Sequence, residues 1–359
     1  MSTLETSRGQ PVESAHALET RPSISVVMPI RNEARSIANT LEDLLRQRYA
    51  RDRFEIIVVD GESTDNTREI VQAFVRKHGN VRLLANPRHW SSAARNIGVR
   101  AARGDLVLIV DGHCAIDSTD YLEELASAFA RTRADCLGRP QPLEVSQPST
   151  LQRAIGIARA SRLGHHPASH VFATTEQEVP AHSVAVAYRR SVFERVGLFD
   201  ESFDACEDVE LNHRVDLAGM RCVVVPALRV SYHPRTTLAG LFRQMQRYGR
   251  GRLRLLRKHP ETFSPLGFAP ALFLMFVAAG PLAAIWSRRA GLFYVVVLSF
   301  YVLTTLGYSA VLALKARRWS LCAWLPAVFA TLHSGAGIGI LIEVPCQLRP
   351  RRTGQADSP

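Results

Sequence analysis

A run of branched apolar residues that ends in Asp111-Gly112-His113 constrains the fold of this chain more than any other segment. The run covers residues 104–110 and carries no charge after Asp105. An apolar run of this length between polar flanks predicts a strand buried on both faces, as found inside parallel sheets. Ligands of parallel sheets bind beyond the carboxyl ends of the strands, so Asp111 and His113 are candidate site residues.

Buried strands alternate with amphipathic helices on both sides of this run. Further strands are predicted at residues 23–30, 54–60, 81–84, 136–140, 184–188 and 221–225. Helices are predicted at about 36–48, 63–78, 91–103, 119–131, 149–161, 190–196 and 208–218, with Ser63 as the N-cap of the second. This alternation predicts an α/β fold, an open and mostly parallel sheet with helices on both faces.

The composition is that of a folded, basic protein. The 359 residues are 47% hydrophobic and 21% charged, with a formal net charge of +11. Such a charge suits nucleic acid, anionic lipid or a phosphorylated substrate. The six cysteines are scattered without a CxxC pair, which argues against a zinc site or a disulfide framework built on them. Residues 1–22 lack an apolar core segment and are expected to form a flexible tail.

The second half of the chain has the character of a membrane protein. Residues 266–286, 291–314 and 319–342 contain no charged side chain. Each is long enough, at about 1.5 Å per helical residue, to cross a hydrocarbon core of about 30 Å. The preceding residues 235–258 carry eight basic residues and no acid, which favours contact with anionic lipid. The expected domains are 23–234 (catalytic), 235–262 (basic interfacial), 263–345 (two or three spans) and 346–359 (tail).

The distribution of basic residues gives the expected orientation. The basic stretch before the spans favours a cytoplasmic catalytic domain on a multi-pass inner-membrane protein. Three spans would leave Arg349, Arg351 and Arg352 outside, whereas two spans and a re-entrant segment would not, and both arrangements stay open. The glycines of residues 335–339 do not follow a strand, so close helix packing is expected there instead of dinucleotide binding.

Five polar clusters are candidate parts of one site. They are Arg31-Asn32-Glu33, Asp60-Gly61-Glu62-Ser63, Asp111-Gly112-His113, Glu207-Asp208 and Gln244-Met245-Gln246-Arg247-Tyr248. The first three follow parallel strands, so they are expected to meet at one edge of the sheet. A separate group, His165, His166, His170 and His182, lacks the tight spacing of zinc ligands and is expected to lie in loops.

In their order and spacing these motifs resemble glycosyltransferase family 2, which has the GT-A fold. The membrane-bound bacterial group of the succinoglycan-biosynthesis glucosyltransferase is the most similar. The matching segments are residues 27–33, 58–65, 94–98, 111–113, 207–211 and 244–248. The resemblance implies an inverting enzyme that transfers a sugar, glucose in this group, from a UDP-sugar to a lipid-linked or polysaccharide acceptor. Such transfer would serve exopolysaccharide or cell-envelope glycan synthesis.

The expected partners are then the UDP-sugar, the acceptor and anionic membrane lipid, without nucleic acid. The basic residues support this choice because they concentrate beside the spans. The alternative from another class is a small membrane transporter with a nucleotide-binding regulatory domain. Spans with almost no charge argue against a substrate path through the membrane.

The resemblance also implies a donor-binding role for one set of residues. These are Pro29, Arg31, Glu33, Asp60, Ser63, Arg95, Gln244 and Arg247. Asp60 would accept hydrogen bonds from the uracil edge, and the planar Arg95 guanidinium would pair with the diphosphate. The alternatives to these binding roles are a solvated ion pair between Arg31 and Glu33 and a surface position for Arg95. Tyr248 stands where processive members carry Trp, which leaves processivity open.

The resemblance implies metal-binding or catalytic roles for four residues, Asp111, His113, Glu207 and Asp208. Asp111 and His113 match the Asp-x-Asp metal motif of the family, with His in the second acidic place. A divalent cation, Mn²⁺ or Mg²⁺, would bridge the two phosphates, and an imidazole ligand favours manganese. Whether His113 ligates the metal or has a structural role stays open. Asp208 matches the catalytic base, and Glu207 would hold the acceptor or cap the helix.

Overall fold

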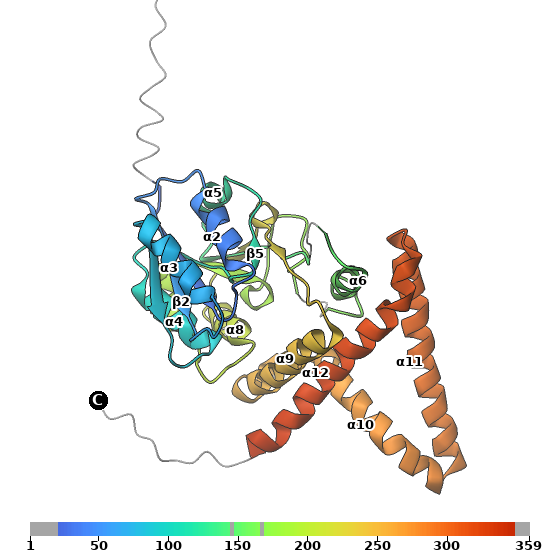
Figure 1. Cartoon of the computed structure of the whole chain (residues 1–359). Coiled ribbons are helices and arrows are strands. Elements are labelled where there is room, and N and C mark those ends of the chain that lie inside the picture. The colour runs from blue at the N-terminus through green and yellow to red at the C-terminus, as the bar shows by residue number, and fades with distance from the viewer. Residues whose placement is uncertain (1–20, 144–146, 166–168, 349–359) are drawn as a thin grey trace, which may run out of the picture.

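The computed structural model describes residues 21–143, 147–165 and 169–348 (Figure 1). Most of both predicted tails, and His166, lie outside this part of the chain. The main sheet contains β1 (Ile24–Ile30), β2 (Phe54–Asp60), β3 (Val81–Ala85), β4 (Leu106–Ile109), β6 (Cys136–Gly138), β7 (Gln177–Glu178), β8 (Ala185–Arg189) and β9 (Cys222–Val224). A separate antiparallel pair joins β5 (Cys114–Ala115) to β10 (Ser231–Tyr232).

The main sheet has eight strands in the order β3-β2-β1-β4-β8-β6-β9-β7. Parallel pairing joins β3 to β2, β2 to β1, β1 to β4, and β6 to β9. Only β8 and β7 run against their neighbours within this described sheet. The predicted α/β architecture with a mostly parallel sheet is therefore confirmed. The central strand β4 ends at Ile109, so Asp111 lies just beyond the carboxyl edge.

Helices cover both faces of the sheet, as predicted. One face carries α2 (Ile37–Leu45), α3 (Thr67–Lys77) and α5 (Tyr121–Thr132), and the other carries α4 (Ser91–Ala101), α7 (Arg190–Val196) and α8 (Glu207–Leu217). Successive residues of β1 point to opposite faces of the sheet. Val26 and Met28 pack in the hydrophobic core on the first face, and Val27 packs in the core on the second. The sheet is thus buried on both sides, and only its edges are open to a ligand.

The start of α3 corrects one prediction. Ser63 is not the N-cap of this helix, which begins at Thr67 with Asn66 in the cap position. The Ser63 hydroxyl instead donates to Asp60 Oδ1 at 2.6 Å and accepts from the Asn32 amide at 2.9 Å. The hydroxyl therefore joins two of the polar loops at the sheet edge.

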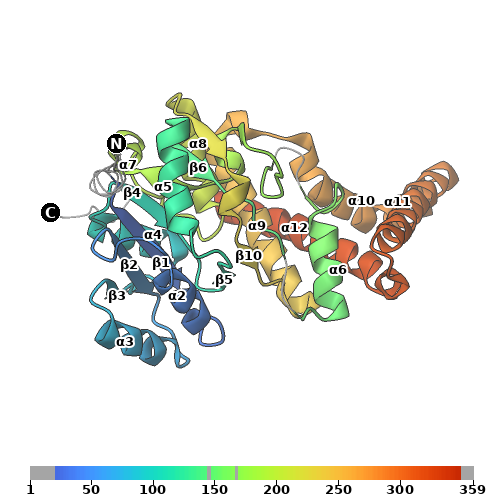
Figure 2. The same ribbon diagram turned by 90° about the horizontal axis from the view of Figure 1, so that it is seen from above.

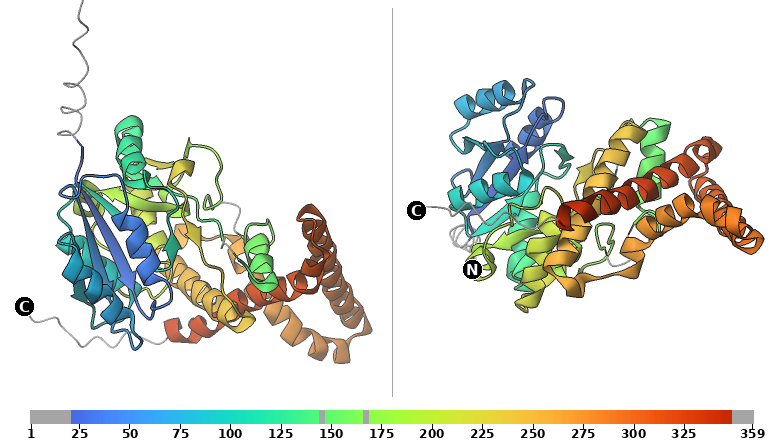
Figure 3. Two further views of the ribbon diagram at one scale, coloured as in Figure 1. Left: turned by 45° about the horizontal axis from the view of Figure 1, so that its top comes forward. Right: turned by 90° about the horizontal axis from the view of Figure 1, so that it is seen from below.

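Three helices of the carboxyl-terminal part are long and apolar enough to cross a membrane. They are α10 (Pro265–Trp286), α11 (Arg288–Lys315) and α12 (Leu325–Leu348). Before them, the basic stretch folds into one amphipathic helix, α9 (Leu238–Lys258). Figures 1 and 3 show α10 and α11 projecting from the α/β part, whereas α12 returns toward it. The helix α6 (Thr150–Arg159) lies beside α9 and α12 (Figure 2).

Glycines bring the backbones of α9 and α12 into direct contact. A Cβ atom on Gly339 would lie 2.1 Å from the Gln246 carbonyl oxygen, and one on Gly249 would lie 2.1 Å from the Ala336 carbonyl oxygen. On Gly335 the same atom would lie 2.9 Å from the Phe242 carbonyl oxygen. The predicted close helix packing of residues 335–339 is therefore confirmed, and its partner is the basic helix.

A buried carboxylate extends this contact to the α/β part. Glu343 of α12 is 1% exposed and accepts from Arg250 Nε at 2.8 Å and from Arg254 Nε at 2.7 Å. Arg254 also donates to Asp204 Oδ1 at 2.7 Å, in the loop that leads into α8. A buried charge is tolerated when it is paired in this way. The membrane-type helix α12 is thus connected through α9 to the loop before Glu207.

We predict that Gly339→Leu loosens α9 from α12. The leucine would collide with the Gln246 backbone, and overpacking of this kind costs about 1–3 kcal/mol. The thermal unfolding midpoint of the full-length protein in detergent should fall. Gly307→Leu in α11 is the matched control, since nothing lies within 4 Å of its added Cβ. Equal midpoints for the two variants would contradict the packing described here.

Candidate active site

The carboxyl ends of β1, β2 and β4 bring the first three polar clusters together, as predicted. These strands are neighbours in the sheet and run parallel, so the loops after Ile30, Asp60 and Ile109 leave the same edge. The left-handed backbone of Asn32 and Glu62, with φ of 57° and 54°, shapes two of these loops. Such conformations are uncommon for residues other than glycine and are often found at functional sites.

One end of the candidate site is built on Asp60. Its side chain is 1% exposed, and Oδ1 accepts from the Ser63 hydroxyl. Arg68 Nη1 lies 3.8 Å from Oδ2. Pro29 is buried in β1 opposite Val59, and Arg31 is exposed beside Gly61. Asp60 is therefore a buried acceptor held in place by its own loop.

Arg95 lies at the centre of the site instead of on the surface. It is 9% exposed in α4, and its Nη2 lies 3.5 Å from Glu207 Oε1 and 3.9 Å from Asp111 Oδ1. Its guanidinium also stacks at 5.4 Å over the ring of Phe199. Its Nε has no hydrogen-bond partner among the described residues. The buried Arg95 guanidinium thus faces two of the predicted acidic clusters, and its Nε–H makes no hydrogen bond to the described residues.

A hydrogen-bonded network fixes the metal motif. Tyr232 donates to Asp111 Oδ2, and its ring meets the His113 ring edge-on at a centroid distance of 4.6 Å. His113 Nδ1 lies 2.8 Å from Glu33 Oε1. Glu33 therefore pairs with His113 within the site, and not with Arg31 as in the alternative of a solvated ion pair. Gly112 allows this approach, because a Cβ there would lie 2.9 Å from Ile30 Cγ2.

The charges of these groups follow from their surroundings. Burial raises the pKa of Asp111, but the charges of Arg95, His113 and Arg139 and the hydrogen bond from Tyr232 together outweigh burial and lower the pKa. Burial lowers the pKa of His113, but its hydrogen bond to Glu33 and the negative charges of Glu33 and Asp111 together outweigh burial and raise the pKa. Burial and the Asp111 charge raise the pKa of Tyr232 well above its usual value, so it remains a donor. Asp111 is therefore an ionised carboxylate at neutral pH.

This donor set fits a divalent cation. Asp111 offers a carboxylate oxygen, and His113 offers Nε2 because Nδ1 is held by Glu33. A carboxylate on the second nitrogen is the usual partner of a metal-ligating histidine, since it fixes the tautomer and the ring orientation. The residues present can thus hold a metal that accepts mixed oxygen and nitrogen ligands, such as Mn²⁺.

The acidic pair begins α8. Glu207 is buried, and burial raises its pKa more than the Arg95 charge lowers it. Asp208 is half-buried and accepts from the Val209 amide at 2.8 Å. Cys206 precedes the pair with a left-handed φ of 63°. The two acids are therefore presented differently, Glu207 toward Arg95 and Asp208 closer to solvent.

The fifth predicted cluster reaches the site through the loop before α8. Arg247 Nη2 donates to the Asp204 carbonyl oxygen at 2.5 Å. Gln244 Nε2 lies 3.5 Å from the Tyr248 hydroxyl, and Arg159 stacks at 5.7 Å over the Tyr248 ring. The face of α9 that carries Arg247 therefore contacts the loop that leads to the acidic pair.

Two residues of the site were missed from the sequence. Tyr232 donates to Asp111, and the positive charge of Arg139 helps to lower the pKa of Asp111. Arg139 is 1% exposed, and its Nη1 donates to the Tyr121 hydroxyl at 3.1 Å. Arg139 directly follows β6, so its place at a strand end was a signal. Tyr232 belongs to a two-residue strand whose pairing with β5 has no sequence pattern.

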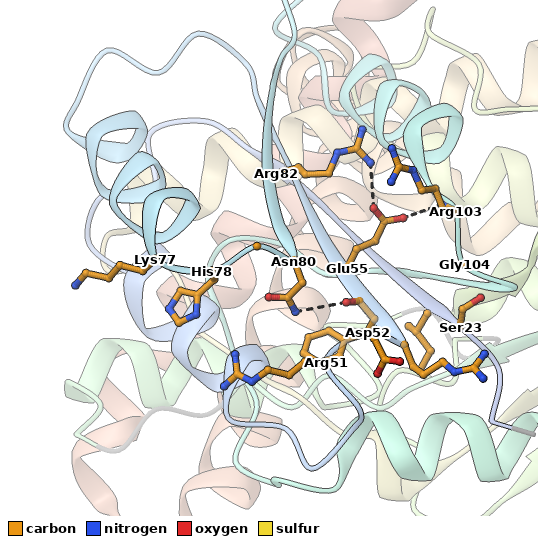
Figure 4. Close-up of a pocket in the computed structure, with 14 residues that line it drawn as sticks. Ser23, Arg51, Asp52, Glu55, Lys77, His78, Asn80, Arg82, Arg103 and Gly104 are labelled. Atoms are coloured by element: carbon orange, nitrogen blue, oxygen red, sulfur yellow. Dashed lines mark hydrogen bonds and ion pairs between the residues drawn. The ribbon is translucent and has the colours of Figure 1, made fainter. Parts of the chain in front are cut away.

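A hollow of about 660 Å³ opens at the opposite, amino-terminal edge of the sheet (Figure 4). Its carboxylate Glu55 is already paired, because it accepts from Arg82 Nη1 at 3.0 Å and from the Arg103 amide at 2.7 Å. Ligands of parallel sheets bind at the other edge, so the size of this hollow does not make it the active site.

Comparison with known proteins identifies the family of the chain. The profile of glycosyl transferase family 2 matches residues 25–197. The succinoglycan biosynthesis protein ExoA of Rhizobium meliloti (strain 1021) is 32% identical over 305 residues, which cover 83% of this chain and 88% of that protein. Glycosyltransferase AglE of Haloferax volcanii is 27% identical and covers 66% of this chain and 75% of its own length.

Among solved structures, the mannosyltransferase PcManGT from Pyrobaculum calidifontis has a similar fold. It was determined in complex with GDP-Man and Mn²⁺. It superposes with a TM-score of 0.59 at 22% identity, covering 90% of this chain and 88% of its own. The fold, the convergent acidic clusters and the extent of the sequence match lead to one assignment: the chain belongs to glycosyl transferase family 2 and is a glycosyltransferase of GT-A fold.

Proposed function

We propose that the protein is an inverting, divalent-cation-dependent hexosyltransferase that transfers glucose from UDP-glucose to a lipid-linked or polysaccharide acceptor. The observation that carries the proposal is the convergence of Asp111, Arg95 and the Glu207-Asp208 pair at the carboxyl edge of the sheet. The relative from Rhizobium meliloti is named a succinoglycan biosynthesis protein, which supports a role in exopolysaccharide or cell-envelope glycan synthesis.

The donor would lie along the sheet edge from Asp60 to Asp111. The buried Asp60 carboxylate would accept from the uracil edge, with Ser63 holding it in place and Pro29, Arg31 and Glu33 lining the same pocket. The unpaired Nε of Arg95 supports a diphosphate contact, because a buried guanidinium with a spare donor suits a phosphate oxygen. This set recognises a nucleoside diphosphate rather than a free sugar.

Asp111 and His113 would hold the cation, with Glu33 and Tyr232 orienting them. The cation supplies neutralisation of the charge that develops on the departing diphosphate. The mannosyltransferase of similar fold binds Mn²⁺, which supports a divalent cation at this place.

Asp208 would take the proton from the attacking acceptor hydroxyl. Its half-buried position at the start of α8 supports contact with an acceptor that arrives from outside. Glu207, buried against Arg95, would position the acceptor or the diphosphate contact. One base and a stabilised leaving group are consistent with direct displacement and inversion, whereas retaining glycosidases use two closely spaced carboxylates.

The membrane part would present a lipid-linked acceptor to this site. Arg247 and Gln244 lie on the face of α9 that borders the loop before α8, and Arg247 would contact the acceptor or diphosphate. The basic side chains of α9 suit anionic lipid at the cytoplasmic face of the inner membrane. Catalytic domain and acceptor would thus meet at the membrane surface.

We predict that Asp208→Asn lowers kcat by about 10²- to 10⁴-fold, the usual contribution of a general base. The KM for the nucleotide sugar should change little, because the donor pocket keeps its residues. The measurement is release of the nucleoside diphosphate by membranes that carry the protein. Glu194→Gln on the exposed side of α7 is the control. Full activity of Asp208→Asn would refute its role as base.

We predict that His113→Asp raises the ratio of activity with Mg²⁺ to activity with Mn²⁺ several-fold. A carboxylate in this place restores an all-oxygen donor pair, which magnesium prefers. Each variant is its own control, because the ratio is measured on one preparation. If the ratio stays unchanged while Asp111→Asn abolishes activity, His113 is a structural residue.

We predict that Tyr232→Phe raises the Mn²⁺ concentration needed for half-maximal activity by roughly 10- to 100-fold, as expected for an outer-shell partner of a ligand. The phenylalanine keeps the edge contact with His113 and removes only the hydroxyl that Asp111 accepts. At saturating Mn²⁺ the activity should return. A loss of activity that excess Mn²⁺ does not restore would argue against this role.

A further inference from the structure

Outside the active site, three histidines and three carboxylates gather where α8 meets the end of α9. The carboxylates are Glu210 and Asp216 of α8 and Glu261 of the short 3₁₀ turn Pro260–Thr262. The histidines are His182, His213 and His259. None of the roles assigned above uses them.

The ligand atoms of His213, His259 and Glu261 all lie within 4.8 Å of one another, so one ion could contact all three. Glu261 Oε1 lies 2.8 Å from His213 Nε2 and 3.4 Å from His259 Nδ1. In a tetrahedral site with Zn–N and Zn–O of about 2.0–2.1 Å, neighbouring ligand atoms are about 3.3 Å apart. The rings of His213 and His259 lie with their centroids 4.8 Å apart, so both nitrogens face the same carboxylate oxygen.

A second layer of contacts orients these ligands. His259 Nε2 lies 3.1 Å from Glu210 Oε1, so the nitrogen that faces away from Glu261 has its own carboxylate. Metal-ligating histidines almost always have such a partner. On the other side of His213, the His182 ring lies with its centroid 6.4 Å away, and Asp216 Oδ2 holds its Nδ1 at 2.6 Å.

We propose that His213, His259 and Glu261 form a second metal site, for Zn²⁺ or another transition metal that prefers imidazole. Two imidazoles and one carboxylate are a common zinc donor set, and they leave one position for water or His182. The His213 and His259 side chains are 13% exposed and Glu261 is 50% exposed, so an ion can enter from solvent.

The metal would connect the carboxyl end of α9 to α8. His213 is on α8, which begins with the acidic pair, and His259 is the C-cap residue directly after α9. The site is independent of the donor sugar and of the cation at Asp111. It would add to the Glu343–Arg254–Asp204 connection at the other side of the same junction.

The test is Zn²⁺ binding by tag-free, chelator-stripped full-length protein in detergent, measured by equilibrium dialysis. All variants carry Asp111→Asn, so that the active-site metal does not contribute. One Zn²⁺ per chain should remain in this background. Adding His213→Ala or His259→Gln should weaken it by more than roughly 10-fold, since even outer-shell partners contribute that much. His78→Ala, outside the cluster, is the matched control.

The unfolding midpoint separates metal loss from misfolding. Zn²⁺ should raise the midpoint of the Asp111→Asn protein and of the His78→Ala control, and should leave that of His213→Ala and His259→Gln unchanged. If His213→Ala does not fold, His259→Gln decides. Equal Zn²⁺ affinity in all variants, or no Zn²⁺ bound in the Asp111→Asn background, would overturn the proposal.

Discussion

The Arg95 guanidinium holds the two halves of the active site at one place. Asp111 follows a strand of the parallel half of the sheet, and Glu207 begins a helix more than ninety residues later. Both carboxylates face the same buried cation, at 3.9 and 3.5 Å. Removing one partner of a buried charge pair typically costs about 3–5 kcal/mol. The Arg95 charge therefore lowers the pKa of both acids, although burial leaves the pKa of Glu207 above its usual value, and α4 sets the position of this charge.

A second set of charges joins the apolar helix α12 to the α/β part of the chain. Glu343 in α12 is buried against Arg250 and Arg254, and Arg254 continues to Asp204 before the acidic pair. Glycines allow the backbones of α9 and α12 to come into direct contact, and this packing positions the charged side chains of the two helices. This arrangement connects an apolar helix to the segment that carries Asp208. The family assignment also decides between the two predicted classes, because it makes the chain a glycosyltransferase and not a transporter.

Much of this was predictable because strand ends and helix starts are local signals. The apolar run before Asp111 and the strand ending in Asp60 fixed the sheet edge where three clusters meet. The burial of Arg95 was not predictable, because an arginine on a helix gives no indication of which face is covered. The position of Tyr232 was not predictable either, because it depends on a two-residue strand. The role of Ser63 was not predictable because its hydroxyl donates to Asp60 and does not cap the helix.

The most direct test of the account is a donor screen with anomeric analysis of the product. Membranes that carry the protein would receive UDP-, GDP- and dTDP-sugars, with Mn²⁺ or with a chelator. The account predicts Mn²⁺-dependent consumption of UDP-glucose and a product whose glycosidic bond has the anomeric configuration opposite to that of the donor. Consumption of no nucleotide sugar, or a product with the donor's configuration, would contradict it.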